Sequence, residues 1–309
     1  MGALDSLLDA SVVFSFDRSG FRRHARRFVA SDLQVSLAGR VVLVTGANSG
    51  LGFAASKALA ALGATVHLLC RDEARGQSAA QAIKGELPSA QLHLHRVDVS
   101  RLADVRRFVE GFHGPVDVLV NNAGVLPPSL TRTDEGHEVT FATNVLGPHA
   151  LTKALLPKLL VAKGRVVTVT SGGMFTQKLD LDVLQGKVQT FDGVVAYAQT
   201  KRAEVILSEL WAVKQPDITF STMHPGWADT PAVRSSLPTF YKWTKGILRT
   251  PEEGADTVVW LAAAPRLEGK SGLLWFDREA VSTHPLSFTK ESDADREALW
   301  ALVESATGG

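Results

Sequence analysis

Short apolar segments alternate with helix-like segments along most of this 309-residue chain. A run beginning at Val41 leads into a glycine-rich turn and then an alanine-rich stretch, and the alternation continues to about residue 276. The apolar runs are Val41 to Val44, Thr65 to Leu69, Gln91 to Val97, Pro115 to Asn121, Arg165 to Thr170, Ile218 to Met223 and Leu273 to Phe276. Strands buried on both faces are apolar throughout, and helices between them imply parallel pairing through crossovers. The sequence predicts a doubly wound α/β fold with a seven-stranded, mainly parallel sheet and helices on both faces.

The chain shows no repeat of solenoid period and no low-complexity linker, so one domain is expected. We place this domain at residues 37–290, with a lid at 230–250, a preceding extension at 1–36 and a C-terminal helix or tail at 291–309. The 33 basic and 32 acidic residues nearly cancel, which favours a small-molecule partner over nucleic acid. The single cysteine, Cys70, cannot form an intramolecular disulfide, and no run of 18 apolar residues or secretory signal is found. We expect an intracellular, cytoplasmic protein.

The first 36 residues have a different pattern. Leu4, Leu7, Leu8, Val12 and Val13 share one helical stripe, and a cluster of arginines follows at positions 22, 23, 26 and 27. Such a helix docks on its own domain, on a second subunit or on a membrane surface, or it forms part of an organelle address. Docking on the protein's own body or a second subunit is the first expectation, and peripheral membrane contact is the second.

A glycine-rich loop lies directly between the first strand and its helix. It reads Thr45-Gly46-Ala47-Asn48-Ser49-Gly50-Leu51-Gly52. Glycines at such a place let the backbone turn tightly and approach a pyrophosphate, whose charge is favoured by free N–H groups at the helix start. The loop therefore predicts a dinucleotide site in a Rossmann-type fold.

The loop spacing Thr-Gly-x-x-x-Gly-x-Gly resembles the short-chain dehydrogenase/reductase family. Three further matches follow in that family's order: Asn121-Asn122-Ala123-Gly124, Tyr197-x-x-x-Lys201 and Pro225-Gly226. Thr-Gly-Ala-Asn-Ser-Gly, Cys70-Arg71-Asp72 and the long segment before Tyr197 are similar to the retinol-dehydrogenase-like branch. Within it, Ser171-Gly172-Gly173-Met174, Gln177-Lys178-Leu179 and the segment from His224 to Pro231 resemble one orphan group. The resemblance covers about Val41 to Phe276 and implies an NAD(P)-dependent enzyme that interconverts alcohols and carbonyls.

The end of the second strand bears on the choice of nicotinamide. An acidic residue there holds the ribose of NAD, whereas arginine accommodates the extra phosphate of NADP. Cys70 and Arg71 occupy this place, which favours NADP(H), although Asp72 is close enough to serve as a ribose ligand. Together with the resemblance, this gives the expected cofactor contacts Gly46, Asn48, Ser49, Gly50, Leu51, Gly52, Arg71, Asp98, Val99, Asn121, Ala123, Gly124, Tyr197, Lys201, Pro225, Gly226, Trp227 and Thr230.

Tyr197 and Lys201 are four residues apart, so they share one face if Val194 to Val213 is helical. A nearby ammonium stabilises a phenolate, and we expect it to lower the pKa of Tyr197 towards the working pH. The family resemblance adds Ser171 as a hydrogen-bond donor to the substrate oxygen and Asn144 as the organiser of a water relay to Lys201. No metal site is predicted. His224, at a strand end, is interpreted as structural.

The segment from Thr230 to Thr250 is rich in apolar and aromatic residues, which suits a lid over a hydrophobic carbonyl or alcohol substrate. The same residues could instead cover the core or meet a second subunit, and a homodimer is expected only from the resemblance. A catalytically silent nucleotide-binding scaffold of the same fold is the alternative function. A nucleotide-sugar epimerase or dehydratase is disfavoured by the loop spacing and by the short chain after Leu274.

Overall fold

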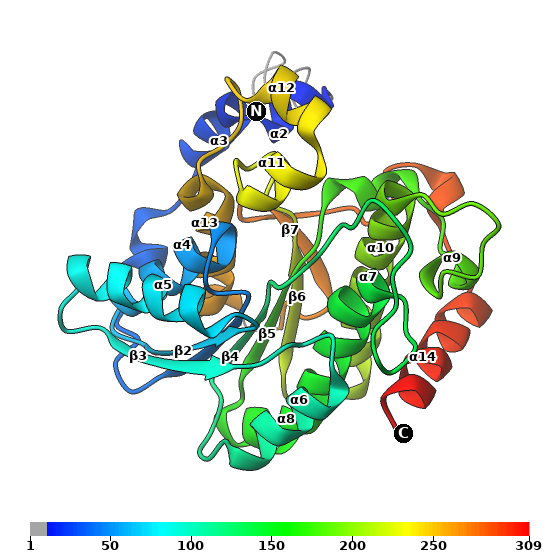
Figure 1. The fold of residues 1–309 in the computed structure, drawn as a ribbon. Helices are drawn as coiled ribbons and strands as arrows, with labels where there is room; N and C mark the ends of the chain where they lie inside the picture. The colour runs from blue at the N-terminus through cyan, green and yellow to red at the C-terminus, as the bar shows by residue number, and fades with distance from the viewer. Residues whose placement is uncertain (1–10, 268, 309) are drawn as a thin grey trace.

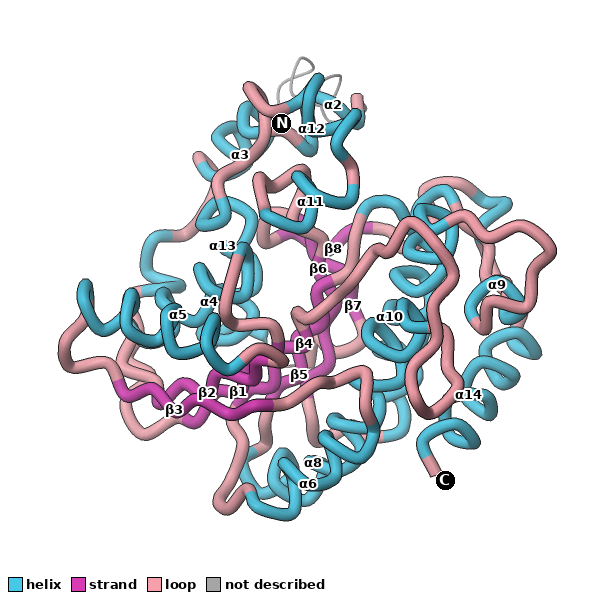
Figure 2. The backbone as a smooth tube through the Cα atoms, viewed as in Figure 1, coloured by secondary structure: helices cyan, strands magenta, loops and turns pink. Residues whose placement is uncertain are grey.

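One mixed sheet forms the centre of the molecule in a computed structural model that describes residues 11–267 and 269–308. Within that part of the chain the strand order is β3-β2-β1-β4-β5-β6-β7-β8, and the first seven strands are parallel (Figures 1 and 2). Their bounds are β1 Val41–Thr45, β2 Thr65–Cys70, β3 Gln91–Arg96, β4 Val118–Asn121, β5 Arg165–Val169, β6 Thr219–Met223 and β7 Leu273–Phe276. The predicted doubly wound fold is confirmed.

The strand count differs from the predicted seven, because β8 (Glu279–Val281) pairs antiparallel with β7 at the sheet edge. Asp277 and Arg278 make the turn between them with φ values of 47° and 62°. A tight hairpin turn commonly needs two residues with positive φ, and glycine or asparagine usually supplies them. Here two other residue types do so, and the hairpin therefore has no strong sequence signal.

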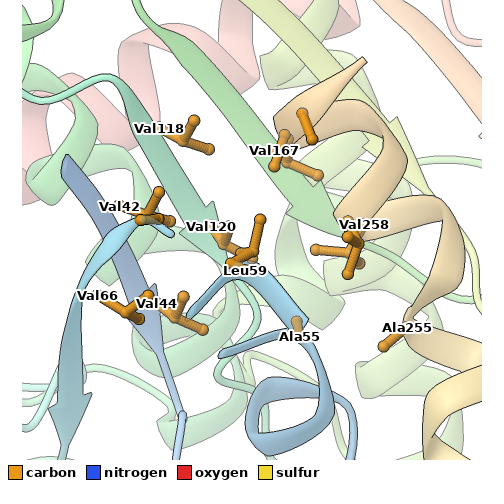
Figure 3. Packing of buried hydrophobic residues seen from close by; sticks show 14 of the residues in the cluster. Val42, Val44, Ala55, Leu59, Val66, Val118, Val120, Val167, Ala255 and Val258 are labelled. Carbon is orange, nitrogen blue, oxygen red and sulfur yellow. The ribbon is translucent and has the colours of Figure 1, made fainter. Parts of the chain in front are cut away.

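Helices cover both faces of the sheet (Figures 1 and 2). On one face lie α4 (Gly50–Ala61), α5 (Glu73–Glu86) and α13 (Pro251–Ala263), and on the other lie α6 (Leu102–Gly111), α8 (Gly147–Ala162) and α10 (Gly193–Lys214). Figure 3 shows the first of these interfaces, where Val44 and Val120 of the sheet meet Leu59 of α4 and Val258 of α13. Two separate apolar layers thus hold the sheet and fix the edge where its strands end.

The chain ends lie against this body. The N-terminal helices are α2 (Val12–Phe16) and α3 (Arg18–Ala25), followed by a 3₁₀ turn, η1 (Ala30–Leu33). Phe16 packs against the rings of His224 and Phe276 at centroid distances of 4.5 and 5.2 Å, so the described part of the extension docks on its own domain. Leu4, Leu7 and Leu8 lie outside the described residues, while Val12 and Val13 are exposed.

The last helix, α14 (Asp293–Thr307), packs Leu299 and Val303 against Ile206 and Leu207 of α10. The remaining short elements include a π-helical turn, η2, which separates α7 from α8 and contains Asn144. They are α7 (Val139–Phe141), η2 (Ala142–Leu146), η3 (Gly172–Thr176), α9 (Leu181–Leu184), α11 (Pro231–Ser236), α12 (Pro238–Thr244), η4 (Pro265–Leu267) and η5 (Ser287–Thr289).

Candidate active site

A cleft of about 520 Å³ opens where the parallel strands end, between the β1–α4 loop and the helices α11 and α12. Most of the residues expected to bind cofactor or substrate line it. These are Gly46, Asn48, Ser49, Gly50, Leu51, Arg71, Asp98, Val99, Ala123, Gly124, Ser171, Tyr197, Lys201, Pro225, Gly226, Trp227 and Thr230. Gly52, Asn121 and Asn144 do not line the cleft. The carboxyl end of an open parallel sheet is where such folds bind ligands.

The glycine loop has the geometry that a phosphate site requires. Gly46 has a φ of 66°, which favours glycine, and a Cβ on Gly52 would lie 2.3 Å from the carbonyl oxygen of Gly46. Gly52 thus serves close packing of α4 on the loop rather than the cleft wall. Among the described residues, no side chain caps the start of α4 at Ser49. Its first N–H groups and the positive end of its dipole are left for an anion.

Two adjacent asparagines at the end of β4 have different roles. Asn121 was expected at the cofactor, but its side chain is buried and donates to Thr152 Oγ1 at 3.4 Å. Asn122 lines the cleft instead, and its amide donates to the carbonyl oxygens of Thr45 and Gly46 at 2.9 and 3.4 Å. Successive residues of an extended strand point to opposite faces, which explains why Asn122 lines the cleft and Asn121 does not. Asn122 braces the glycine loop.

The segment from the end of β2 to the first turn of α5 presents two cations to the cleft. Arg71, as expected, and Arg75, which the sequence reasoning missed, both line it and are exposed. Asp72 does not line the cleft, because its carboxylate caps α5 by accepting from the Arg75 amide at 3.0 Å. Asp98 lines the adjacent wall and accepts hydrogen bonds from the amide and hydroxyl of Ser100 at 3.0 and 2.7 Å.

Ser171, Tyr197 and Lys201 meet at the other end of the cleft. Tyr197 and Lys201 are on one face of α10, and Nζ of the lysine lies 5.3 Å from the centre of the phenol ring. The Ser171 hydroxyl is close enough to the phenol to lower the pKa of Tyr197. A hydroxyl, a phenol and an ammonium around one space can bind a carbonyl oxygen and exchange a proton with it.

The expected lowering of the Tyr197 pKa is only part of the balance. Burial raises the pKa of the phenol, Lys201 and the bond from Ser171 lower it, and Glu204 raises it, so the net pKa lies above the ordinary value. For Lys201, burial lowers the pKa, but Glu204 and Tyr197 outweigh it and the net pKa is raised. Lys201 lowers the pKa of Tyr197 as predicted, but burial and Glu204 together raise it by more.

Glu204 is a site residue that sequence reasoning missed. Lys201 Nζ donates to Glu204 Oε1 at 2.7 Å and to the Val169 carbonyl at 2.9 Å, and both charged side chains are buried. Burial raises the pKa of Glu204 to about 7, against the lowering effect of Lys201. Three residues apart on a helix is also the spacing of an ordinary surface ion pair, so nothing in the sequence distinguishes this buried pair from an exposed one.

Asn144 lies behind the cleft wall, in the π-helical turn. Its Oδ1 accepts from the Val125 amide at 2.9 Å, and its Nδ2 donates to Thr200 Oγ1 at 2.9 Å. The side chain therefore ties the segment after β4 to the helix that carries Tyr197 and Lys201. π-turns inside helices are frequent at functional sites.

The lid residues divide into two sets. Pro231, Val233, Leu237 and Phe240 line the cleft, whereas Trp243 is 80% exposed. His224 lies outside the cleft lining and stacks on Phe276 at 4.1 Å; burial lowers its pKa to about 3, which fits the structural role expected of it. In the described part of the chain no three His, Cys, Asp or Glu side chains are grouped as metal ligands.

Comparison with known proteins gives one consistent family. The short chain dehydrogenase profile matches residues 40–239. Dehydrogenase/reductase SDR family member 12 of Bos taurus is 44% identical over 94% of this chain and 93% of its own length. Polyprenol dehydrogenase of Mus musculus is 35% identical over 87% and 84%, and human (Homo sapiens) retinol dehydrogenase 12 is 32% identical over 89% of each chain. The first of these is the orphan group that the sequence motifs indicated.

Solved structures agree. An uncharacterized protein from Mycobacterium Paratuberculosis superposes with a TM-score of 0.71 at 29% identity, covering 91% of this chain and 97% of its own. A 3-ketoacyl-(acyl-carrier-protein) reductase from Brucella melitensis, complexed with NADH, gives 0.62 at 25% identity over 77% and 96%. A protein from Beutenbergia cavernae with bound NADP gives 0.60 at 25% over 77% and 95%. Family match, fold and cleft agree: this chain belongs to the short-chain dehydrogenase/reductase family, on its retinol-dehydrogenase-like branch, and is an NAD(P)-dependent oxidoreductase.

Proposed function

We propose that this protein is an NADP(H)-dependent oxidoreductase that interconverts an alcohol and a carbonyl on a hydrophobic substrate, with Tyr197 as general acid/base. The observation that carries the proposal is that Ser171, Tyr197 and Lys201 line the same cleft as the uncapped start of α4. One end of this cleft can hold a pyrophosphate and the other can hold a reacting oxygen. A nicotinamide bound between them supplies or accepts the hydride.

Side chains of the protein bind the substrate oxygen and supply its proton. Ser171 donates a hydrogen bond to the substrate oxygen, and Tyr197 gives its phenolic proton to that oxygen during reduction. The Lys201 ammonium stabilises the phenolate that results. Because burial keeps the phenol protonated near neutral pH, the site as described suits reduction of a carbonyl. Asn144 holds the segment after β4 in place, and its part in a water relay stays a prediction.

The preference for NADP(H) rests on Arg71 and Arg75. Two guanidinium groups line the cleft at the end of β2, where a ribose phosphate would lie, while Asp72 is engaged as a helix cap. A ribose ligand of the NAD type is thus absent from this wall among the described residues. The cofactor is therefore proposed to be NADP(H) rather than NAD(H).

The substrate proposal rests on the lid. Val233, Leu237 and Phe240 give the cleft an apolar wall beside Tyr197. Two relatives are named for polyprenol and retinol, both long apolar alcohols. We propose a long-chain, isoprenoid-like alcohol or aldehyde as the substrate class.

Membrane contact is proposed for the surface beside the lid. Val12, Val13, Phe14, Trp243 and Ile247 are exposed by 57, 41, 51, 80 and 38%, and Figure 1 places α2 next to α12. We call these five residues the apolar rim. The Arg18 amide donates to the Ile247 carbonyl at 2.8 Å, which joins the two segments, and Lys242 and Lys245 are exposed nearby. Within the described residues no helix is long and apolar enough to cross a bilayer. A cytoplasmic enzyme resting on an anionic membrane surface fits these features.

The homodimer stays a prediction. α14 packs on α10 and α8 and covers part of the face through which a dimer would form. Val161 and Val213, at the C-terminal ends of α8 and α10, remain 79 and 81% exposed. A dimer of these helices would use this uncovered end, and light scattering of the purified protein would show twice the mass of one chain.

The deciding experiment is a fluorescence titration with NADPH and NADH, followed by a screen of carbonyl compounds monitored by loss of reduced-nicotinamide absorbance. Turnover by the wild type that Tyr197→Phe abolishes, with NADPH binding retained, supports the proposal. NADPH binding without turnover of any compound would instead favour the catalytically silent scaffold.

A further inference from the structure

A second, much smaller pocket lies beside Glu204, the buried partner of Lys201, and shares no lining residue with the cleft. Its volume is about 30 Å³, which by the size of a water probe leaves room for about two water molecules. Its polar lining comes from Asn121, Asn144, His149, Thr152, Thr168, Glu204 and Ser208. We call it the rear chamber. Asn144 lines it, whereas Ser171, Tyr197 and Lys201 do not.

Four buried polar atoms of this lining have no hydrogen-bond partner within the described chain: Asn121 Oδ1, His149 Nδ1, Glu204 Oε2 and Ser208 Oγ. Buried polar atoms are nearly always hydrogen-bonded, because an unpaired one costs about 1–3 kcal/mol. Four such atoms around one chamber of this size require water inside it. We infer that the chamber, whose lining is otherwise mostly apolar, holds water beside these four atoms.

Glu204 connects the chamber to the active site. Its Oε1 accepts from Lys201 Nζ at 2.7 Å, and Lys201 also lines the cleft, while Oε2 is the unpaired atom in the chamber. One oxygen of this carboxyl group therefore contacts the lysine that lines the cleft, and the other is free to bond water in the chamber. A carboxyl group placed in this way can receive a proton on one oxygen and release one from the other.

His149 connects the chamber to the surface. Its Nδ1 is unpaired in the chamber, and its Nε2 lies 2.9 Å from Glu304 Oε1 on α14. Glu304 is 26% exposed and also pairs with Lys153 at 2.5 Å. Burial lowers the pKa of His149 to about 4, so the ring is neutral near pH 7 and carries one proton between its two nitrogens.

We propose that Glu204, the water of the rear chamber and His149 form a proton path from Glu304 at the surface to Lys201, which resupplies Tyr197 during carbonyl reduction. The inference rests on the proposed function. After Tyr197 has given its proton to the substrate oxygen, one proton moves inward along each link. Lys201 gives a proton to the phenolate and takes a proton from Glu204. Glu204 takes a proton from the chamber water, and the water takes one from His149. His149 takes its proton from solvent at Glu304. His149 enters with its proton on Nδ1 and leaves with it on Nε2, and Glu204 enters with its proton on Oε1 and leaves with it on Oε2. The ring and the carboxyl group each turn over before the next cycle, and one solvent proton is consumed per turnover.

The charge around Glu204 supports this use. The ionisable groups that face it are Lys201 and Tyr197 from its own helix and His149 across the chamber, while Asn121 and Ser208 are uncharged. With a pKa of about 7, Glu204 is divided between its two protonation states near neutral pH, which is the condition for passing a proton on. As pH rises through this value, Glu204 loses its proton and the resupply slows.

The test compares Glu204→Gln with wild type. The amide keeps an oxygen for Lys201 but cannot carry the proton. We expect wild-type kcat for reduction to fall with an inflection near neutral pH, and Glu204→Gln to be about tenfold or more slower and without that inflection. NADPH affinity should change by less than about twofold, because Glu204 does not line the cleft. The matched control is Glu209→Gln, on the same helix but paired with Arg296 at 2.6 Å, which should keep the wild-type profile.

A second readout needs neither cofactor nor substrate. Infrared difference spectra of the unliganded protein should show a protonated carboxyl band that titrates near pH 7 in wild type and is missing in Glu204→Gln. If Glu204→Gln unfolds at a lower temperature, His149→Phe replaces it and should remove the kinetic inflection while leaving the band. An unchanged kcat profile in the folded variants, or the absence of the band, would overturn the proton path. Failure of the proposed function differs, because then wild type shows no turnover that Tyr197→Phe removes.

Discussion

Arg249 and Asp277 form a buried, two-bonded ion pair beneath the lid, with nitrogen–oxygen distances of 2.6 and 2.9 Å. The same guanidinium donates to the carbonyl oxygens of Ser15, Phe16 and Pro225. Phe16 in turn accepts from the Trp227 amide at 2.8 Å. The N-terminal segment is therefore fastened to residues that line the cofactor cleft.

The first prediction concerns this anchor. Arg249→Met removes the charged partner of the buried Asp277 carboxylate, which keeps only His24 among the described residues, and takes a donor from the carbonyls of Ser15, Phe16 and Pro225. It should lower the free energy of unfolding by about 3–5 kcal/mol in a denaturant titration. Limited proteolysis should cleave the N-terminal segment faster. Arg27→Met, which removes a half-exposed pair with Glu279, should cost less than about 1 kcal/mol. Equal losses of unfolding free energy in the two variants would show that Arg249 holds the N-terminal segment no more strongly than a surface ion pair does.

The second prediction concerns the cofactor. Arg71→Ala and Arg75→Ala should each weaken NADPH by about tenfold or more in a fluorescence titration and leave NADH within about twofold, because each removes one charged hydrogen bond to the ribose phosphate. Lys84→Ala, in the last turn of α5 and away from the cleft, is the control. Equal weakening of NADPH and NADH would remove the phosphate assignment.

The third prediction uses the fact that the chain has two tyrosines, Tyr197 and Tyr241. Tyr197→Phe should reduce kcat by about 10²–10⁴-fold, as expected for loss of a general acid, while Tyr241→Phe should keep most of the activity. In Tyr241→Phe the ultraviolet tyrosinate signal reports Tyr197 alone. Since burial raises its pKa, ionisation should begin above the ordinary value of about 10 in the unliganded protein. Ionisation below that value would show that Lys201 prevails over burial.

The fourth prediction concerns acid stability. The folded state holds His224 neutral, with a pKa of about 3, whereas an unfolded histidine titrates near 6.5. The unfolded chain therefore binds a proton first as pH falls, and stability should decline from about pH 6.5 downwards by about 1.4 kcal/mol per pH unit from this residue. His224→Phe keeps an aromatic ring against Phe276 and should make the decline shallower. An unchanged slope would mean that His224 is protonated in the fold.

The fifth prediction concerns the apolar rim. Sedimentation with vesicles that contain anionic lipid should carry the protein down, and Trp243→Ser should reduce this binding without changing NADPH affinity, because Trp243 is exposed and does not line the cleft. Val213, at the far end of α10, is also an exposed apolar residue but lies outside the apolar rim. Val213→Ser is therefore the control and should bind vesicles like wild type. No sedimentation of wild type would contradict membrane contact.

Much of the fold could be predicted because buried parallel strands have a simple signal. The runs at Val41, Thr65 and Arg165 became strands within a residue or two of their expected bounds. The eighth strand could not be predicted, since Glu279–Val281 is short and its turn at Asp277 and Arg278 lacks glycine. The docking of Phe16 could not be predicted either, because its partners lie over 200 residues away.

For the site, local motifs placed the residues whose spacing fixes their direction. Tyr197 and Lys201 share a helix face, and the glycines sit at a strand end, so both could be predicted. Asn122, Arg75 and Glu204 could not, because their direction depends on how a strand end, a helix start and a neighbouring helix pack together. From its spacing alone, Glu204 would be taken for a solvent-facing partner of Lys201, but the packing of α10 on β6 and η2 buries it.

The hydrogen bonds of Arg249 also limit which sequence changes this fold can accept. One planar guanidinium with five N–H donors binds three segments that are far apart in the sequence. They are the N-terminal segment at Ser15 and Phe16, the turn after β6 at Pro225 and the hairpin at Asp277. Lysine has one nitrogen and cannot reach all three at once. Shifting the hairpin would leave the buried guanidinium without its carboxylate, and shifting either of the other two segments would leave some of its N–H groups without carbonyl acceptors, so a change in one segment favours a compensating change in the others.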